Sequence, residues 1–429
     1  MEKKHYSADI SKLDYLTAKD VIGILEIKPQ TLYAYVSRGW VRTLAQQGTR
    51  EKLYVREDVE KLQARSHARA GHGPVAADAL RWGEPVVNSS ITELTQEGPS
   101  YRGRLATDIA RMDCPFEVTA DLLWSGIWNE KTAFWPSYQP SSEFTTLVSP
   151  YFNRTSPALV RGRLAMLVQC LGETQNGNPE IALGSTTAAA RQIVQVIAGA
   201  FGVLLGSPFV QAESGESVAD LLMRAMHRDA DDTVRRGLNA TLNLAADHEL
   251  ALPTFIARAA ASTGANLNAC VLTGLTTFDG PLTGTAGSGI EELLSSCQTK
   301  ADLKAQVLHA HKLGRQFPGF NHPMYPNGDP RAHFLLEFAR SLHTLPAAAH
   351  ALLETVEELA REFHIVPSFP AGLAILQLAL GLPPGCGSAL FFLGRIAGLV
   401  AHVQEQRMAA FFIRPRARYV GVKANEKIQ

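Results

Sequence analysis

Apolar residues recur at helical spacing along most of the chain, and short polar turns separate the segments that show this spacing. One such segment ends near Gly126, which is typical of a helix C-terminus. Patterns that favour short strands or turns are confined to residues 84–92 and 101–103. The spacing predicts helices over residues 116–124, 158–171, 186–205, 218–226 and 234–244. We therefore expect a mainly α-helical body.

Residues 1–65 follow a different pattern, with two short helical segments around a tight turn. Thr17 stands at a helix N-cap position, and Asp20 stands at the capping-box position that pairs with it. Pro29 suits the first turn of the second helix. A small hairpin with Arg and Lys residues follows, and residues 58–62 favour a third helix. These features predict a separate N-terminal module.

This module resembles the winged helix-turn-helix of the MerR and excisionase type. The resemblance implies that the second helix reads bases and the hairpin contacts phosphate. The candidate DNA-binding residues are Gln30, Thr31, Tyr33, Arg38, Arg50 and Lys52. Acidic residues dilute the basic face, namely Glu51, Glu57, Asp58 and Glu60. The alternative is a docking or dimerisation module that never meets DNA. The sequence leaves both open, because salt-dependent binding needs several basic residues on one face.

The composition favours a folded protein with a sizeable core. The chain has 429 residues, of which 46% are hydrophobic and 19% are charged. This length suits two or three domains at about 100–200 residues each. Its 41 basic and 41 acidic residues give zero net charge, so the whole chain lacks the positive excess typical of nucleic-acid-binding proteins.

Three features favour a cytoplasmic protein that does not contact a membrane. The five cysteines are scattered and lack metal-ligand spacing, which indicates reduced thiols and no metal site. The N-terminus shows no apolar secretory segment. The most apolar stretch, 389–403, contains Arg395 and His402, so a buried helix is expected there.

Residues 66–80 are small and polar and are expected to be a linker.

The chemistry concentrates in residues 318–332, where four prolines and two glycines rule out a plain helix or strand. His322 and Arg331 lie in this rigid loop. A histidine can donate a hydrogen bond to a carbonyl oxygen or move a proton near neutral pH. An arginine can hold a carboxylate through two parallel hydrogen bonds. The loop is therefore a candidate site for a small carboxylic acid.

The loop resembles the citrate synthase signature, a Gly-Phe-Gly-His start and a Tyr followed by Asp-Pro-Arg-Ala, with Asn321 where the family usually has Gly. The resemblance extends over about 91–421 and implies a two-lobed, homodimeric helical body. It implies a large domain over 81–270 and 376–429 and a small domain over 271–375. It also implies that His322 polarises the ketone of oxaloacetate. The implied carboxylate-binding residues are His248, Arg331, Arg395 and, across the dimer interface, Arg414.

Two departures concern the chemistry itself. The family stabilises the enol of acetyl-CoA with a His in a Gly-Pro-Leu-His-Gly motif, and here Thr283 takes that position. The family base is an Asp before a late helix, and here Pro370 or Ser368 takes its place, depending on register. The nearby candidates to substitute for these residues are Glu249 and His333. General-base catalysis contributes about 10²–10⁴-fold and one oxyanion donor about 10²–10³-fold.

Three functions follow from this combination. The first is a weakly active or inactive member that binds oxaloacetate or citrate and reports it to the N-terminal module. The second is an active citrate synthase or a related acyltransferase that condenses acetyl-CoA, or another acyl-CoA, with a 2-oxoacid. The third is a helical scaffold whose site is vestigial. None of the three requires a bound cofactor, since acetyl-CoA would be a co-substrate.

Overall fold

The computed structural model describes residues 15–25, 27–37, 41–45, 52–56, 58–59, 87–130, 134–152, 160–278, 280, 290, 300–313, 317 and 319–415. The chain forms two compact units, residues 1–88 with 415–429 and residues 89–414. Three predicted site residues lie outside the described residues, namely Arg38, Arg50 and Thr283.

The N-terminal unit combines two helices with a three-stranded antiparallel sheet in the order β1-β3-β2. Its elements are β1 (Tyr15–Leu16), α1 (Ala18–Leu25), α2 (Pro29–Ser37), β2 (Thr43–Ala45) and β3 (Lys52–Val55). The predicted capping box is confirmed, because the Thr17 backbone N–H donates to Asp20 at 3.1 Å and the Asp20 N–H donates to the Thr17 hydroxyl at 3.3 Å. A small core holds the unit together: Leu16, Val21, Leu25, Leu32, Val41, Tyr54 and Val59.

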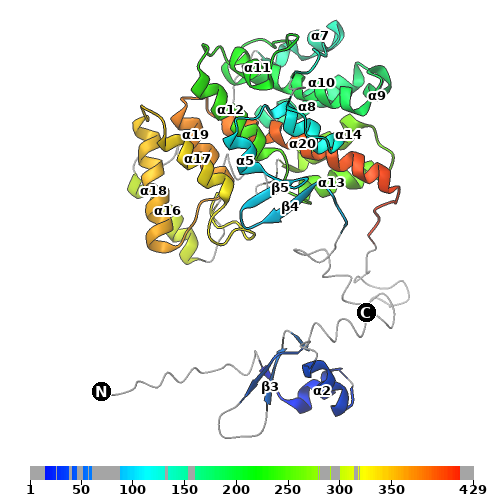
Figure 1. The fold of residues 1–429 in the computed structure, drawn as a ribbon, viewed down its shortest axis with the longest axis vertical. Helices are drawn as coiled ribbons and strands as arrows, with labels where there is room; N and C mark the ends of the chain where they lie inside the picture. The colour runs from blue at the N-terminus through cyan, green and yellow to red at the C-terminus, as the bar shows by residue number, and fades with distance from the viewer. Residues whose placement is uncertain are drawn as a thin grey trace, which may run out of the picture. The chain divides into compact units, whose positions relative to one another are not determined.

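The unit formed by residues 89–414 begins with a second antiparallel sheet and continues as helices (Figure 1). The strands are β4 (Thr92–Thr95), β5 (Gly98–Tyr101) and β6 (Arg104–Leu105). The first helices are α5 (Ala106–Arg111), α6 (Phe116–Ser125), α7 (Ser142–Phe152), α8 (Val160–Glu173), α9 (Pro179–Ala182), α10 (Thr186–Gly199), α11 (Val218–Ala225) and α12 (Asp232–Ala245). The later helices are α13 (Leu252–Ala261), α14 (Leu267–Phe278), α16 (Lys300–Lys312), α17 (Pro330–Arg340), α18 (Ala347–Phe363), α19 (Phe369–Ala379) and α20 (Cys386–Ala409).

The five helices expected from apolar spacing are present, with one difference in detail. The expected helix 186–205 is α-helical only as far as Gly199 and continues as a 3₁₀ helix over Ala200–Leu205. A Cβ at Gly199 would lie 1.9 Å from the Val210 carbonyl oxygen, so the backbone of the next segment packs directly on this glycine. The change to the tighter helix therefore occurs where a neighbouring chain segment crosses.

Two hydrophobic clusters form the interior of this unit. The larger cluster surrounds α20, which packs against helices including α6, α12, α13 and α14. The smaller cluster lies among α16–α19, which gather on one side of the unit in Figure 1. Helices α17 and α19 contribute to both, since Leu335 and Phe369 belong to the larger cluster and Ala332 and Ile375 to the smaller. The two clusters therefore meet at the α17–α19 pair.

Two described segments are long and apolar enough to cross a membrane, Thr186–Leu205 and Cys386–Ala409. Within the fold, 83% and 94% of their most apolar windows are buried. The expectation that 389–403 lies in a buried helix is confirmed, because the residues of α20 in this range lie inside the larger cluster.

Candidate functional site

Two backbone-directed hydrogen bonds join the predicted loop to the segment that leads into α19. The Asn321 N–H donates to the Val366 carbonyl at 2.9 Å, and the Asn321 side-chain oxygen accepts from the Val366 N–H at 2.9 Å. Asn321 has φ +51°, a left-handed conformation that Gly adopts freely and that Asn tolerates better than other residues. This explains how Asn can stand where the resemblance expects Gly. These hydrogen bonds therefore fix the backbone directly before His322.

His248 lies in the turn after α12 and meets two rings of the loop. Its ring centroid is 5.2 Å from that of His322 and 5.8 Å from that of Tyr325, both in edge-to-face geometry. The His248 Nε2 atom lies 3.2 Å from the Tyr325 hydroxyl. The structure thus brings together two imidazoles that are 74 positions apart in the chain.

Arg331 occupies the first turn of α17 and is 2% exposed. Its Nε and Nη2 donate to the two oxygens of Asp329 at 3.0 and 2.7 Å, so this pair is bidentate. Its remaining nitrogen, Nη1, is buried and has no hydrogen-bond partner among the described residues. A buried cationic N–H without an acceptor is costly, so an anionic oxygen placed there would be strongly favoured.

Arg395 comes from α20 and is 2% exposed. Its Nε donates to the Ala245 carbonyl at 3.0 Å, and its two terminal nitrogens have no hydrogen-bond partner within the described chain segments. Burial lowers the pKa of Arg395, and the charge of Arg331 lowers it further, while Asp247 opposes this shift. The charges of both buried guanidiniums act on the His248 ring, so Arg331 and Arg395 both lie within electrostatic reach of that histidine.

Both histidines are held neutral at pH 7. Burial lowers the pKa of His248 well below its usual value, and the charges of Arg331 and Arg395 act in the same direction. Burial and then Arg331 also lower the pKa of His322. The Met324 N–H donates to His322 Nδ1 at 3.2 Å, so the ring proton of neutral His322 is on Nε2. His322 can therefore donate a hydrogen bond to a carbonyl oxygen, which is the role expected from sequence.

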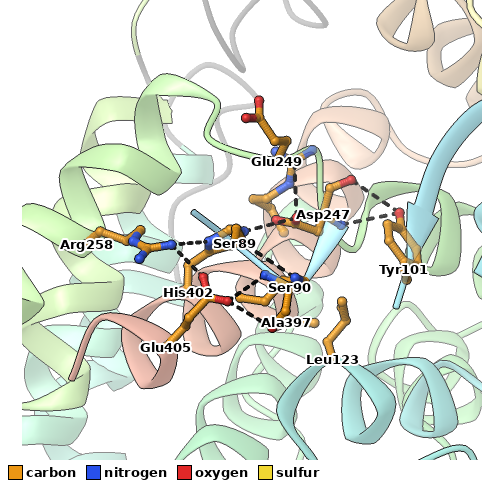
Figure 2. Close-up of polar contacts among 12 residues, drawn as sticks. Ser89, Ser90, Tyr101, Leu123, Asp247, Glu249, Arg258, Ala397, His402 and Glu405 are labelled. Atoms are coloured by element: carbon orange, nitrogen blue, oxygen red, sulfur yellow. Dashed lines mark hydrogen bonds and ion pairs between the residues drawn. The ribbon is translucent and has the colours of Figure 1, made fainter. Parts of the chain in front are cut away.

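The other predicted residues are less closely joined to this group. Arg414 is exposed in the segment after α20, and no contact among the described residues joins it to the histidines. Ser368 is the buried N-cap residue of α19, and Pro370 is its half-buried second residue. Glu249 and His333 are both exposed. Figure 2 shows the Glu249 carboxylate directed away from the neighbouring polar contacts.

The carboxylates that the described residues bring to the site already have partners. Asp329 binds Arg331, and Asp247 lies 3.2 Å from His402. Burial raises the pKa of Asp329, but Arg331 outweighs burial and the net shift is downward. Asp329 is therefore an ionised structural partner of Arg331. Within the described part of the chain, no group of His, Cys, Asp or Glu is suited to a metal ion.

Three residues of the site were given no role in the sequence analysis. Asp329 is the N-cap of α17, and the Asp-Pro start of this helix could have indicated that role. His402 follows Arg395 by seven residues, which places both on one face of α20. Tyr325 was seen only as part of the loop pattern, and its contact with His248 joins segments whose proximity no local spacing reveals.

The site has two buried arginines on α17 and α20, and two facing neutral histidines, one in the turn after α12 and one in the Pro-rich loop. The family profile described as "Citrate synthase, C-terminal domain" matches residues 80–416. The chain belongs to the citrate synthase family. The N-terminal unit lies outside this match, apart from its residues 80–88 and 415–416.

Curated relatives are similar at low identity. The chain is 30% identical over 203 residues to a 2-methylcitrate synthase of Shewanella oneidensis, a match that covers 44% of this chain and 52% of the relative. It is 27% identical over 284 residues to citrate synthase 1 of Mycobacterium tuberculosis, covering 62% of this chain and 65% of the relative. In both cases the chain spans between half and two thirds of the relative's length.

Solved structures show the same fold. Citrate synthase from Thermotoga maritima superposes with a TM-score of 0.67 at 22% identity, over 81% of this chain and 96% of that protein. The enzyme from Thermoplasma acidophilum, solved as a ternary complex with carboxymethyl coenzyme A and oxaloacetate, also gives 0.67, at 19% identity over 81% and 97% of the two chains. The predicted mainly helical, citrate-synthase-like fold is thereby confirmed.

Proposed function

We propose that this protein binds oxaloacetate or citrate as a carboxylate sensor and turns over acetyl-CoA weakly or not at all. The single observation that supports binding most strongly is the buried Nη1 of Arg331, which has no hydrogen-bond partner among the described residues, and the buried Arg395 adds a second cation. A dicarboxylate would supply acceptors to both guanidiniums, and Nε2 of His322 would donate to its ketone oxygen. Charge-assisted hydrogen bonds of this kind contribute about 1.5–3 kcal/mol each.

The two carboxylates that the described residues bring to this site, Asp329 and Asp247, already have partners and are not free for the proton-abstraction step. Ser368 and Pro370 occupy the two positions considered for the base, and neither side chain removes a proton at pH 7. At the other substituted position Thr283 could donate a hydrogen bond, but it is not a proton shuttle at pH 7. Losing the base costs about 10²–10⁴-fold and losing an oxyanion donor about 10²–10³-fold.

Calorimetric titration of the full-length protein with oxaloacetate and with citrate tests the binding function. We expect saturable binding of at least one acid, and we expect Arg395→Met to weaken it by about tenfold or more, the equivalent of 1.4 kcal/mol. Absence of heat and of any melting shift with either acid at millimolar concentration would favour a vestigial site and overturn the proposal.

The alternative is an active citrate synthase or a relative that uses another acyl-CoA or 2-oxoacid. The name of the Shewanella relative, a 2-methylcitrate synthase, gives a reason to include propionyl-CoA among the substrates tested. Thr283→His combined with either Ser368→Asp or Pro370→Asp restores the family residue types. An Asp at the N-cap or first turn of α19 also suits the helix dipole. A sensor should gain activity from these changes, whereas an already active enzyme should gain little.

We propose that the N-terminal unit is a winged helix-turn-helix that binds DNA. We also propose that the protein is cytoplasmic and that its citrate-synthase-like body forms a homodimer. Support comes from α2, which exposes Gln30 and Tyr33 (70% exposed), and from the exposed Lys52 on β3. The positive charge of this unit is partly neutralised, because Arg42 forms a bidentate ion pair with Asp58. Selection from random duplexes should enrich one sequence, and Tyr33→Ala should weaken its binding. Equal affinity for all duplexes, or none at 50 mM salt, would favour a docking module instead.

A further inference from the structure

A continuous row of polar contacts joins Asp247, His402, Arg258 and Glu405 (Figure 2). The Asp247 carboxylate oxygen Oδ2 is 3.2 Å from Nε2 of His402, and Nδ1 of His402 is 3.4 Å from Nη1 of Arg258. The same Arg258 nitrogen donates to Glu405 at 2.6 Å. His402 and Glu405 come from α20, Arg258 comes from α13, and Asp247 directly precedes His248. Three helical segments are thus tied together immediately beside the site.

The hydrogen-bond chemistry of this row fixes the form of His402. An arginine nitrogen can only donate, so Nδ1 of His402 must accept from Arg258. The ring proton is therefore on Nε2, where it donates to Asp247. Charge is balanced pairwise, because Arg258 compensates Glu405 and the Nε2–H group compensates part of the Asp247 charge. Burial raises the pKa of Asp247, but His402 and then Arg395 outweigh burial, and the net shift is downward.

Asp247 also holds the turn in which His248 sits. Its Oδ2 accepts from the Glu249 N–H at 3.1 Å, and Glu249 has the unfavourable φ of +54°. The Tyr101 hydroxyl lies 3.3 Å from the N–H and from the carbonyl oxygen of Asp247. A Cβ at Gly398 would lie 2.1 Å from Oδ1 of Asp247, so α20 leaves no room for this side chain to move. The residues on both sides of His248 are fixed by the same carboxylate.

We propose that Asp247 and His402 are positioning residues that hold His248 against Tyr325 and the ligand. This inference rests on the proposed function, because the carboxylate ligand assigned above is what His248 would contact. Without the Asp247–His402 bond, the strained backbone at Glu249 is no longer held and can relax. His248 then turns away from the Tyr325 hydroxyl, and the site loses its geometry while the helices around it remain packed.

Two substitutions at His402 separate hydrogen bonding from packing. Gln can accept from Arg258 through its carbonyl oxygen and donate to Asp247 through its amide, which reproduces both contacts. Leu fills a similar volume and makes neither. Asp247→Asn provides a second route, since it keeps the size of the side chain and removes the charge. Glu117→Leu is the matched control, because Glu117 is another buried carboxylate, bonded at 2.6 Å to the Val218 N–H and outside the site.

Two readouts are needed for each variant. Calorimetry gives the dissociation constant for oxaloacetate. Nitrogen-15 spectra of ligand-free protein labelled at histidine show the ring-nitrogen signals of His248. These signals are assigned as the ones that disappear in His248→Gln. We expect His402→Gln to bind within about threefold of the parent, and His402→Leu and Asp247→Asn to bind at least about tenfold more weakly. The His248 signals should move in the last two variants and stay in place in His402→Gln and in the control.

The outcomes distinguish the inference from the proposed function. If the parent binds neither oxaloacetate nor citrate, the proposed function fails, and the His248 spectra still test the positioning role. If His402→Leu and Asp247→Asn leave the His248 signals and the affinity unchanged, the positioning role is wrong. It is equally wrong if Glu117→Leu weakens binding as much as they do, since the loss then reflects general destabilisation. Should His402→Leu not fold, Asp247→Asn is compared with His402→Gln under the same criteria.

Discussion

The two buried arginines of the site should respond to removal in opposite ways. Arg331 is paired with Asp329, which is completely buried. Among the described residues Arg395 has no carboxylate partner, and its Nε donates to the Ala245 carbonyl. Replacing each in turn by Met keeps a long apolar stem and removes the charge. Both variants should lose oxaloacetate binding, and they should differ in stability.

The magnitudes follow from what each substitution leaves behind. Arg331→Met leaves the Asp329 carboxylate buried without its partner, and breaking a buried pair in this way costs about 3–5 kcal/mol. Arg395→Met removes one charge-assisted hydrogen bond, a loss of about 1.5–3 kcal/mol. It also relieves the burial of a charge and its repulsion from Arg331, which the lowered pKa of Arg395 reflects. The effective cost of burying one ion is several kcal/mol, on the order of the bond that is lost, so the net change should be neutral or stabilising.

The assay is a thermal melt of both variants and the parent, without ligand and at one protein concentration. We expect Arg331→Met to melt well below the parent and Arg395→Met to melt at or above it. This would identify Arg395 as a residue kept for ligand binding at the expense of stability. Equal lowering of both melting temperatures would refute the reasoning, since it would mean that Arg395 has a stabilising partner of its own.

Three further predictions concern the backbone and pH. Asn321→Val should lower the free energy of unfolding by about 1–3 kcal/mol because of the φ of +51°, whereas Asn321→Gly should lower it less. Chemical denaturation measures both losses, and equal losses would argue against backbone strain at this position. Gly398→Ala should lower the melting temperature and weaken oxaloacetate binding, because its methyl group would meet Asp247; unchanged binding would contradict this. The pKa values of His248 and His322 are lowered on folding, so the unfolded chain binds more protons below the usual value of 6.5, and stability should fall as the pH drops through that range. Melts between pH 8 and 5 test this, and His322→Gln should flatten the dependence.

Much of the fold could be predicted from local pattern. Apolar spacing located the helices of the body, and the Thr17–Asp20 capping box was readable from residue types alone. The end of α10 could not be predicted in this way, because the change to a 3₁₀ helix depends on the Val210 backbone packing on Gly199. Propensity acts within a few residues, whereas this contact joins segments that local sequence does not relate.

The candidate site could be predicted in part. The loop with His322 and Arg331 was visible because its prolines and glycines are unusual together. What the sequence did not reveal is how the charges are distributed. Among the described residues, Arg331 pairs with a carboxylate and keeps one nitrogen without a partner, Arg395 pairs with no carboxylate, and Asp247 bonds to His402. These differences arise from burial and from contacts between distant segments, and they decide which residues are free to bind a ligand.

Weak or absent turnover by a protein that binds oxaloacetate is tested most directly by measuring release of the CoA thiol from acetyl-CoA and oxaloacetate by the full-length protein. This measurement should be made on the same sample whose oxaloacetate-binding sites have been counted by calorimetry. The account predicts occupied sites and a rate about 10⁴-fold or more below that of an active family member, from the combined loss of base and oxyanion donor. Turnover at a rate typical of enzymes, about 1 s⁻¹ or faster per binding site, would contradict it and would mean that another side chain serves as the base.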